Sequence, residues 1–212
     1  MRRRALFPLL GLAALLALAI ALAASLGGSS GHGSASIETH SGAGSTSGFD
    51  GAALPESVTA PAFVLSDQYG HAVSPSAFHG QVTILTFLYS TCGATCVVIA
   101  QQIRGALDEL AHPVPVLIIS GDPAADSPAR VSSFLGETSL TGRVRYLSGP
   151  LSRLRPIWRA YRIAPASAGR AAFARSASVL LLDPQGRERV LFGLEQLTPE
   201  TLAHDIRRLQ TG

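Results

Sequence analysis

One apolar run restricts the fold more than any other feature of this chain. The stretch "QVTILTFLY", residues 81–89, is rich in β-branched and aromatic residues and contains no turn residue. Such a run is typical of a strand that is buried on both faces, in a sheet that helices cover. A second run, "PVPVLIIS" at 113–120, predicts another buried strand, and a helical pattern lies between the two. This alternation indicates an α/β fold with a mixed central sheet and helices on both faces.

Shorter patterns predict the other elements of the fold. Ser127 precedes a proline, and so does Thr198, which is the pattern of an N-cap followed by the first helical position. We expect a helix at 150–163 to be broken or kinked near Pro156, because proline removes a helical hydrogen bond. The remaining expected elements are hairpins at 60–78 and 176–193, a short strand at 144–149 and a helix that the cysteines open.

The N-terminal segment carries a targeting signal. "MRRR" precedes 22 residues without a charge, and a spanning helix needs about 20 apolar residues. The length favours a retained anchor, although Ala21-Leu22-Ala23 also fits the cleavage site of a signal peptide. Either interpretation exports the rest of the chain and keeps the arginines in the cytoplasm. We predict residues 1–26 as membrane anchor or signal segment, 27–53 as a flexible Gly/Ser-rich tether and 54–212 as one globular domain outside the cytoplasm.

The positive charge of the chain comes from arginine alone, since all 17 Lys/Arg positions are arginines, and with 14 acidic residues the net charge is +3. Many of them lie between Arg143 and Arg175. That stretch is either a solvated face or a docking surface for an acidic partner. We expect no nucleic-acid partner, because no nucleic-acid-binding motif is present and aromatic residues do not alternate with the arginines.

The two cysteines of the chain, Cys92 and Cys96, follow the first buried strand. A domain of about 155 residues has a sufficient core and needs no disulfide for stability, which favours chemistry. A helix N-terminus stabilises a thiolate, the form that both redox exchange and metal binding require. Since residues four apart on a helix are too widely spaced for a disulfide, we expect Cys92 in the loop and Cys96 in the first helical turn. The pair can then be a structural disulfide, a redox pair or a clamp for a soft ion such as Cu(I).

The order of several motifs resembles the Sco/SenC family of copper-delivery proteins. "FVLSDQYG", "HGQVTILTFLYSTCGATC", "ISGDPAADSPARVSSFL", "WRAYRI" and "SVLLLDPQGR" are similar to the family's hairpin, cysteine loop, Asp-Pro segment, helix and later strand. The resemblance implies a thioredoxin-like fold tethered to the outer face of an energy-transducing membrane. It also implies delivery of copper to the binuclear copper site of a cytochrome c oxidase subunit, or reduction of that site's cysteines. Further partners would be other exported thiol-redox proteins.

The chain departs from the family pattern at the expected third copper ligand. Where the family has a histidine, "FARSASVLLLDP" has Arg175, which cannot bind a metal. Copper would then be Cu(I) on Cys92 and Cys96 alone. We expect Arg175 on the loop before the hairpin strand, where it would lower the pKa of Cys92 and make it the reactive thiol, with Cys96 resolving. "GAT" between the cysteines also lacks the usual Pro-Asp, and Ala125 replaces a usual arginine.

The other histidines are expected to be ordinary surface residues, with His79 the first substitute ligand; they are His71, His79, His112 and His204. Three functions remain open. The first is Sco-like copper handling, and the second is a thiol–disulfide oxidoreductase without copper, which the missing histidine favours. A peroxiredoxin-like peroxidase is the third, although "FLYSTCGATC" lacks that family's proline before the cysteine. An interaction module with inert cysteines is the non-chemical alternative.

Overall fold

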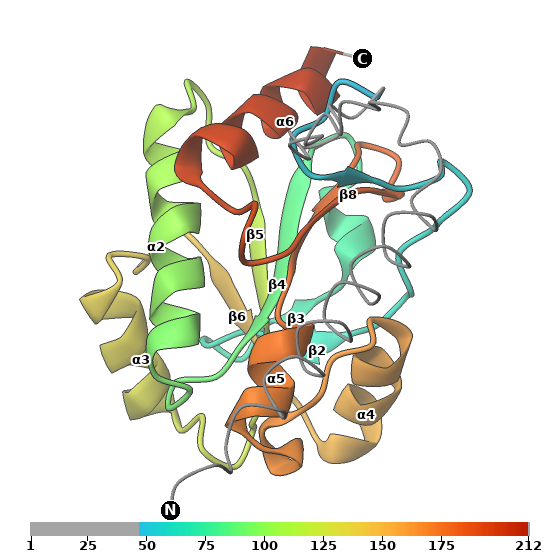
Figure 1. Ribbon diagram of the computed structural model, residues 1–212. Coiled ribbons are helices and arrows are strands. Elements are labelled where there is room, and N and C mark those ends of the chain that lie inside the picture. The colour runs from blue at the N-terminus through green and yellow to red at the C-terminus, as the bar shows by residue number, and fades with distance from the viewer. Residues whose placement is uncertain (1–46, 212) are drawn as a thin grey trace, which may run out of the picture. The chain divides into compact units, whose positions relative to one another are not determined.

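A six-stranded sheet forms the centre of the structure, a computed structural model that describes residues 47–211 (Figure 1). The strand order is β1-β8-β7-β4-β5-β6. Strands β4, β5 and β6 run parallel, whereas β7 pairs antiparallel with both β4 and β8, and β1 pairs antiparallel with β8. The predicted mixed sheet is therefore confirmed.

The strands lie where the apolar runs predict them. All residues of β4 and β5 are buried, as expected for strands in the middle of a covered sheet. A separate hairpin joins β2 to β3, and its turn contains Tyr69 and Gly70. The strands are β1 Ala52–Ala53, β2 Leu65–Ser66, β3 Ala72–Val73, β4 Thr83–Leu88, β5 Val116–Ser120, β6 Arg145–Leu147, β7 Val179–Leu182 and β8 Glu188–Phe192.

Helices flank the sheet. Helices α2 and α6 pack against each other in front of it in Figure 1. At the other helices, Tyr161 at the end of α4 contacts the ring of Phe87 in β4, and Phe173 of α5 contacts Tyr89. The helices are η1 Pro75–Phe78, α2 Ala94–Glu109, α3 Pro128–Glu137, α4 Leu151–Ala160, η2 Ala166–Ala168, α5 Arg170–Ser176 and α6 Pro199–Thr211.

Two predicted helix starts are confirmed by their caps. The Ser127 hydroxyl accepts a hydrogen bond from the Arg130 N–H, and the Thr198 hydroxyl accepts one from the Thr201 N–H. The helix is not broken at Pro156, because α4 runs through it, and the alternative of a kink stays a prediction. Buried side chains hold this helix on both sides of the proline, with Leu154 before it and Trp158 after it. The Trp158 Nε1–H also donates to the Ser120 carbonyl oxygen at 2.9 Å, which helps to offset the missing helical hydrogen bond.

The start of the folded region lies upstream of Leu54. Strand β1 belongs to the segment 27–53, and Ala52 and Ala53 pair with Leu191 and Val190 of β8. Residues 1–46 and 212 are outside the described residues, and so are the predicted anchor at 1–26 and most of the tether. Between residues 47 and 211, none of the helices combines the length and apolarity needed to cross a membrane.

Candidate functional site

The two cysteines meet at the end of β4 and form a disulfide. Cys92 lies in the turn after the strand, and Cys96 lies in the first turn of α2, as the spacing predicts. Their Cα atoms are 5.8 Å apart, within the usual range for a disulfide. The pair therefore links the C-terminal end of a central strand to the N-terminus of the helix that follows it.

Local backbone geometry sets up this turn. The Cys92 N–H donates to the Tyr89 carbonyl oxygen at 3.1 Å. Gly93, the N-cap residue of α2, has a φ of 78°, a conformation that residues with a Cβ rarely adopt. Cys96 is fully buried and Cys92 is 7% exposed, so the sulfur that a partner reaches first is that of Cys92. The positive end of the α2 dipole favours a thiolate at this position after reduction.

Asp126 holds the segment just before the cysteines. Its Oδ1 accepts the Ser90 N–H at 2.7 Å, and its Oδ2 accepts the Ser120 hydroxyl at 2.6 Å. The Tyr146 hydroxyl lies 2.7 Å from the same Oδ2. Burial first, and then the charge of Asp126, hold the pKa of Tyr146 well above its usual range, so its hydroxyl stays protonated and donates. One carboxylate thus fastens the cysteine turn to the end of β5 and to the middle of β6.

The positive charge of Arg170 acts on Tyr89, which lies just before the cysteine turn. Tyr89, three residues before Cys92, is buried, and burial raises the pKa of its hydroxyl while the positive charge of Arg170 opposes the rise. The Tyr89 ring meets Phe173 edge to face, with ring centroids 4.8 Å apart. Helix α5 therefore presents both an aromatic ring and a positive charge to the strand that leads into the cysteines.

Arg175 lies elsewhere than on the expected loop. It is in the last turn of α5 and is exposed, because the chain after η2 forms a short helix. Its side chain lines a cavity of about 540 Å³ together with Tyr161, Glu188 and Leu191. Among the described residues, no hydrogen bond or ion pair joins Arg175 to a cysteine. Its expected influence on Cys92 stays a prediction.

None of the described histidines groups with the two cysteines as a set of possible metal ligands. The His79 ring packs against Gly186 in the β7–β8 turn, at the opposite end of β4 from the cysteines. His112 follows the C-terminal end of α2, which is 16 residues long and therefore about 24 Å in length. His71 contacts Asp67, and His204 contacts Asp205. Within residues 47–211, therefore, no histidine stands in for the missing ligand.

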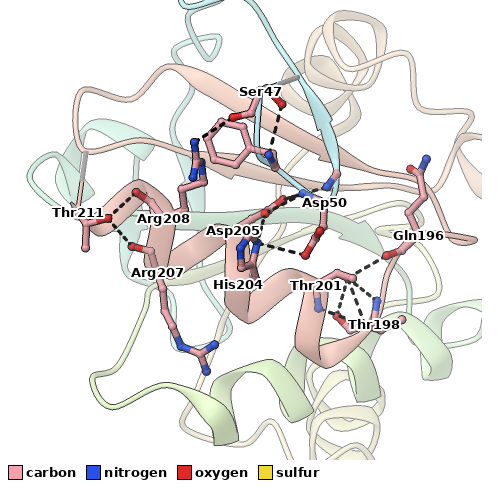
Figure 2. A network of polar contacts seen from close by, with 12 residues as sticks. Ser47, Asp50, Gln196, Thr198, Thr201, His204, Asp205, Arg207, Arg208 and Thr211 are labelled. Atoms are coloured by element: carbon pink, nitrogen blue, oxygen red, sulfur yellow. Dashed lines mark hydrogen bonds and ion pairs between the residues drawn. The ribbon is translucent and has the colours of Figure 1, made fainter. Parts of the chain in front are cut away.

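A second group of metal-ligand types gathers where the middle of α6 meets the residues before β1 (Figure 2). The ligand atoms of Asp50, His204 and Asp205 lie within 4.8 Å of one another. However, the fully buried Asp205 carboxylate accepts the N–H groups of Asp50 and Gly51 as well as the His204 ring. The oxygens of the Asp205 carboxylate are therefore used in hydrogen bonds that hold the residues before β1 against α6. We assign the group a structural role.

A family model described as SCO1/SenC matches residues 51–211. The chain belongs to the SCO1/SenC family. A comparison with curated protein sequences returns no match. The matched region begins just before β1 and ends with α6, so it covers all the described strands and helices.

Solved Sco structures share this fold. Yeast Sco1 is 22% identical, with a TM-score of 0.61 over 73% of this chain and 95% of that chain. Bradyrhizobium japonicum ScoI with copper bound is 27% identical, with a TM-score of 0.54 over 72% of this chain and 99% of that chain. BsSco, described as a member of the Sco family with a disulfide switch, is 19% identical, with a TM-score of 0.61 over 76% of this chain and 98% of that chain. The resemblance seen in the motifs is therefore confirmed as family membership and fold.

Proposed function

We propose that this protein handles Cu(I) and thiols for assembly of the cytochrome c oxidase copper site. The single observation that carries the proposal is the Cys92–Cys96 pair at the strand-to-helix junction of a SCO1/SenC fold. Relatives of the same fold are described with copper bound, among them Bradyrhizobium japonicum ScoI and Arabidopsis thaliana ScoI. We further propose that the N-terminal segment anchors the domain on the extracytoplasmic side of the membrane.

In this proposal copper is cargo rather than a resident cofactor. Reduction of the disulfide provides two thiolates from Cys92 and Cys96, and soft thiolates select Cu(I). Two sulfurs support a low-coordinate Cu(I) site, whereas Cu(II) favours nitrogen ligands in a tetragonal arrangement. Because no described histidine groups with the pair, we expect at most one Cu(I), held by two sulfurs without a third protein ligand. Such a low-coordinate ion can be passed on to an acceptor.

Thiol transfer uses the same two residues. The Cys92 thiolate attacks one sulfur of a partner disulfide, and a mixed disulfide forms while one partner thiolate leaves. Cys96 then loses its proton to solvent and attacks the Cys92 sulfur, which releases the second partner thiolate. Two electrons pass to the partner, which becomes the dithiol, and the protein returns to the disulfide form seen here. Another exported dithiol protein would then reduce the pair again.

The second candidate is thiol–disulfide exchange without copper. The observation that favours it is the position of Arg175, a residue that cannot ligate metal, on α5 without a bond to the cysteines. A metal-free oxidoreductase needs only the disulfide, a stabilised thiolate and access to Cys92, all of which the site provides.

Anaerobic titration of the reduced full chain with Cu(I), followed by native mass spectrometry, separates the two candidates. Copper handling predicts one Cu(I) per chain, lost when Cys92 and Cys96 are both replaced by serine. An unchanged mass with copper present, together with normal thiol exchange, would support the oxidoreductase instead. The variant Arg175→His tests the missing ligand, since a retained Cu(II) signal in this variant alone requires residue 175 to reach the site.

A further inference from the structure

A basic surface lies on α4, α5 and the segment between them (Figure 1), and Phe173 of α5 contacts Tyr89, three residues before Cys92. Residues 150–176 contain six arginines and no acidic residue. All six are exposed, and within the described residues none of them forms an ion pair. The members of this basic surface are Arg153, Arg155, Arg159, Arg162, Arg170 and Arg175.

Residues 47–211 contain eight other arginines, and most of these have an acidic partner. Six of them form ion pairs with aspartate or glutamate, as Arg145 does with Asp67 at 2.9 Å and Arg143 does with Asp108. Like charges four residues apart on a helix repel one another, as those of Arg155 and Arg159 do on α4, so this surface carries a cost in the isolated domain. A partner of opposite charge removes that cost, and the charge complementarity increases the association rate and the specificity of binding.

A cavity opens within this surface. It has a volume of about 610 Å³, and Arg155 and Arg159 lie on its wall together with the apolar side chains of Leu151, Trp158 and Ile163. Leu151 is 46% exposed, whereas the other two apolar side chains are buried. The cavity therefore offers a recessed apolar floor beside two arginines and one carboxylate, that of Asp122, so its wall carries a net positive charge. Such a cavity suits an apolar side chain whose flanking carboxylates face the arginines.

The cavity also adjoins the cysteine turn. Gly121 forms part of its wall, and a Cβ at Gly121 would lie 3.2 Å from the Tyr89 ring and 3.0 Å from the Phe173 ring. Tyr89 in turn accepts the N–H of Cys92 on its carbonyl oxygen. A segment bound in the cavity would thus lie against the same wall that supports the reactive disulfide.

We infer that the basic surface docks an acidic protein segment, whose carboxylates face the arginines and whose apolar side chain enters the cavity. A protein segment fits better than an anionic membrane, because Leu151 is the one large hydrophobic side chain of 150–176 that is exposed, and the cavity is recessed. The inference rests on the proposed function for why a partner comes to this face. Docking is nevertheless measured without copper or thiols, so either proposal can fail alone.

Trp158 is the one tryptophan of the chain and lines the cavity, so its fluorescence reports occupancy directly. The probe is a short glutamate-rich peptide with one central leucine, added to the full chain in neutral detergent micelles. We expect a shift of Trp158 emission that saturates and that high salt weakens. Alanine in place of the leucine should weaken binding roughly tenfold.

Charge reversal locates the docking site. Arg159→Glu should lower the affinity for the peptide roughly fivefold, and Arg155→Glu, as a second variant, should do the same. The matched control is Arg130→Glu, which reverses an exposed, unpaired arginine on α3, away from α4 in Figure 1, and should stay within about twofold. The inference would be overturned if Arg130→Glu lost as much affinity for the peptide as Arg159→Glu, or if the peptide produced no shift of Trp158 emission. A shift produced by phosphatidylglycerol added to the micelles but not by the peptide would also overturn it, because that result assigns the surface to anionic lipid.

Discussion

Removal of the Asp126 carboxylate should loosen the cysteine turn and destabilise the domain. In Asp126→Ala, the Ser90 N–H and the hydroxyls of Ser120 and Tyr146 lose a shared acceptor. Hydrogen bonds to a charged group contribute about 1.5–3 kcal/mol each. Water can replace part of this at a partly buried site, and Tyr146 can turn to the Leu88 carbonyl oxygen 3.2 Å away. We therefore expect a loss of about 3–5 kcal/mol in the free energy of unfolding.

Urea unfolding of the oxidised full chain measures this loss, and amide hydrogen exchange at Ser90 measures the local effect. Asp126→Asn is the matched variant, because its oxygen can still accept the Ser90 N–H while the charge is gone. It should lose about 1–3 kcal/mol and keep the Ser90 amide protected, whereas Asp126→Ala should expose that amide. Asp108→Asn, an exposed carboxylate paired with two arginines, should change stability by about 1 kcal/mol or less. The reasoning fails if Asp126→Ala unfolds like the wild type and protects Ser90 equally.

Two further predictions concern charge at the site and stability at low pH. Arg170→Ala should slow alkylation of reduced Cys92 more than Arg175→Ala does, because the charge of Arg170 acts on Tyr89, just before the cysteine turn. A larger effect of Arg175→Ala in the same rate assay would instead support Arg175 as the residue that lowers the pKa of Cys92. Burial opposes ionisation of Asp183, but hydrogen bonds from the Arg187 backbone and guanidinium and its charge lower the Asp183 pKa overall. Its contribution is complete above the unfolded pKa of about 4 and is lost as the pH falls through the lower folded pKa, so urea unfolding of Asp183→Asn should show a flatter acid limb than the wild type.

The fold was predictable because its signals are local. The uninterrupted run of β4 specifies a buried strand, and the Ser127 and Thr198 caps specify helix starts within a few residues. The cysteine turn was predictable for the same reason, since its geometry depends on a spacing of four residues. The helix is not broken at Pro156 because packing of distant residues on α4 outweighs one missing hydrogen bond.

The supporting residues of the site were harder to predict. Asp126 reaches Ser90 across 36 positions of sequence, and only the β4–β5 pairing brings them together. The sequence analysis noted the family-like Asp-Pro segment that contains Asp126 but did not single out this residue, and its partners were not visible. Arg170 was missed because η2 and α5 have weak patterns of their own, so nothing in the sequence placed their faces relative to Tyr89.

The most direct test of the central claim is a transfer experiment with the acceptor. Reduced full-chain protein carrying one Cu(I) is mixed, without oxygen, with the copper-free domain of the oxidase subunit that holds the binuclear site. Copper and free thiols are then counted in each protein after separation. The account predicts that copper moves to the acceptor, or that two electrons move and the Cys92–Cys96 disulfide returns, and that neither occurs when both cysteines are serine. Retention of both copper and reduced thiols by this protein, with an unchanged acceptor, would contradict it.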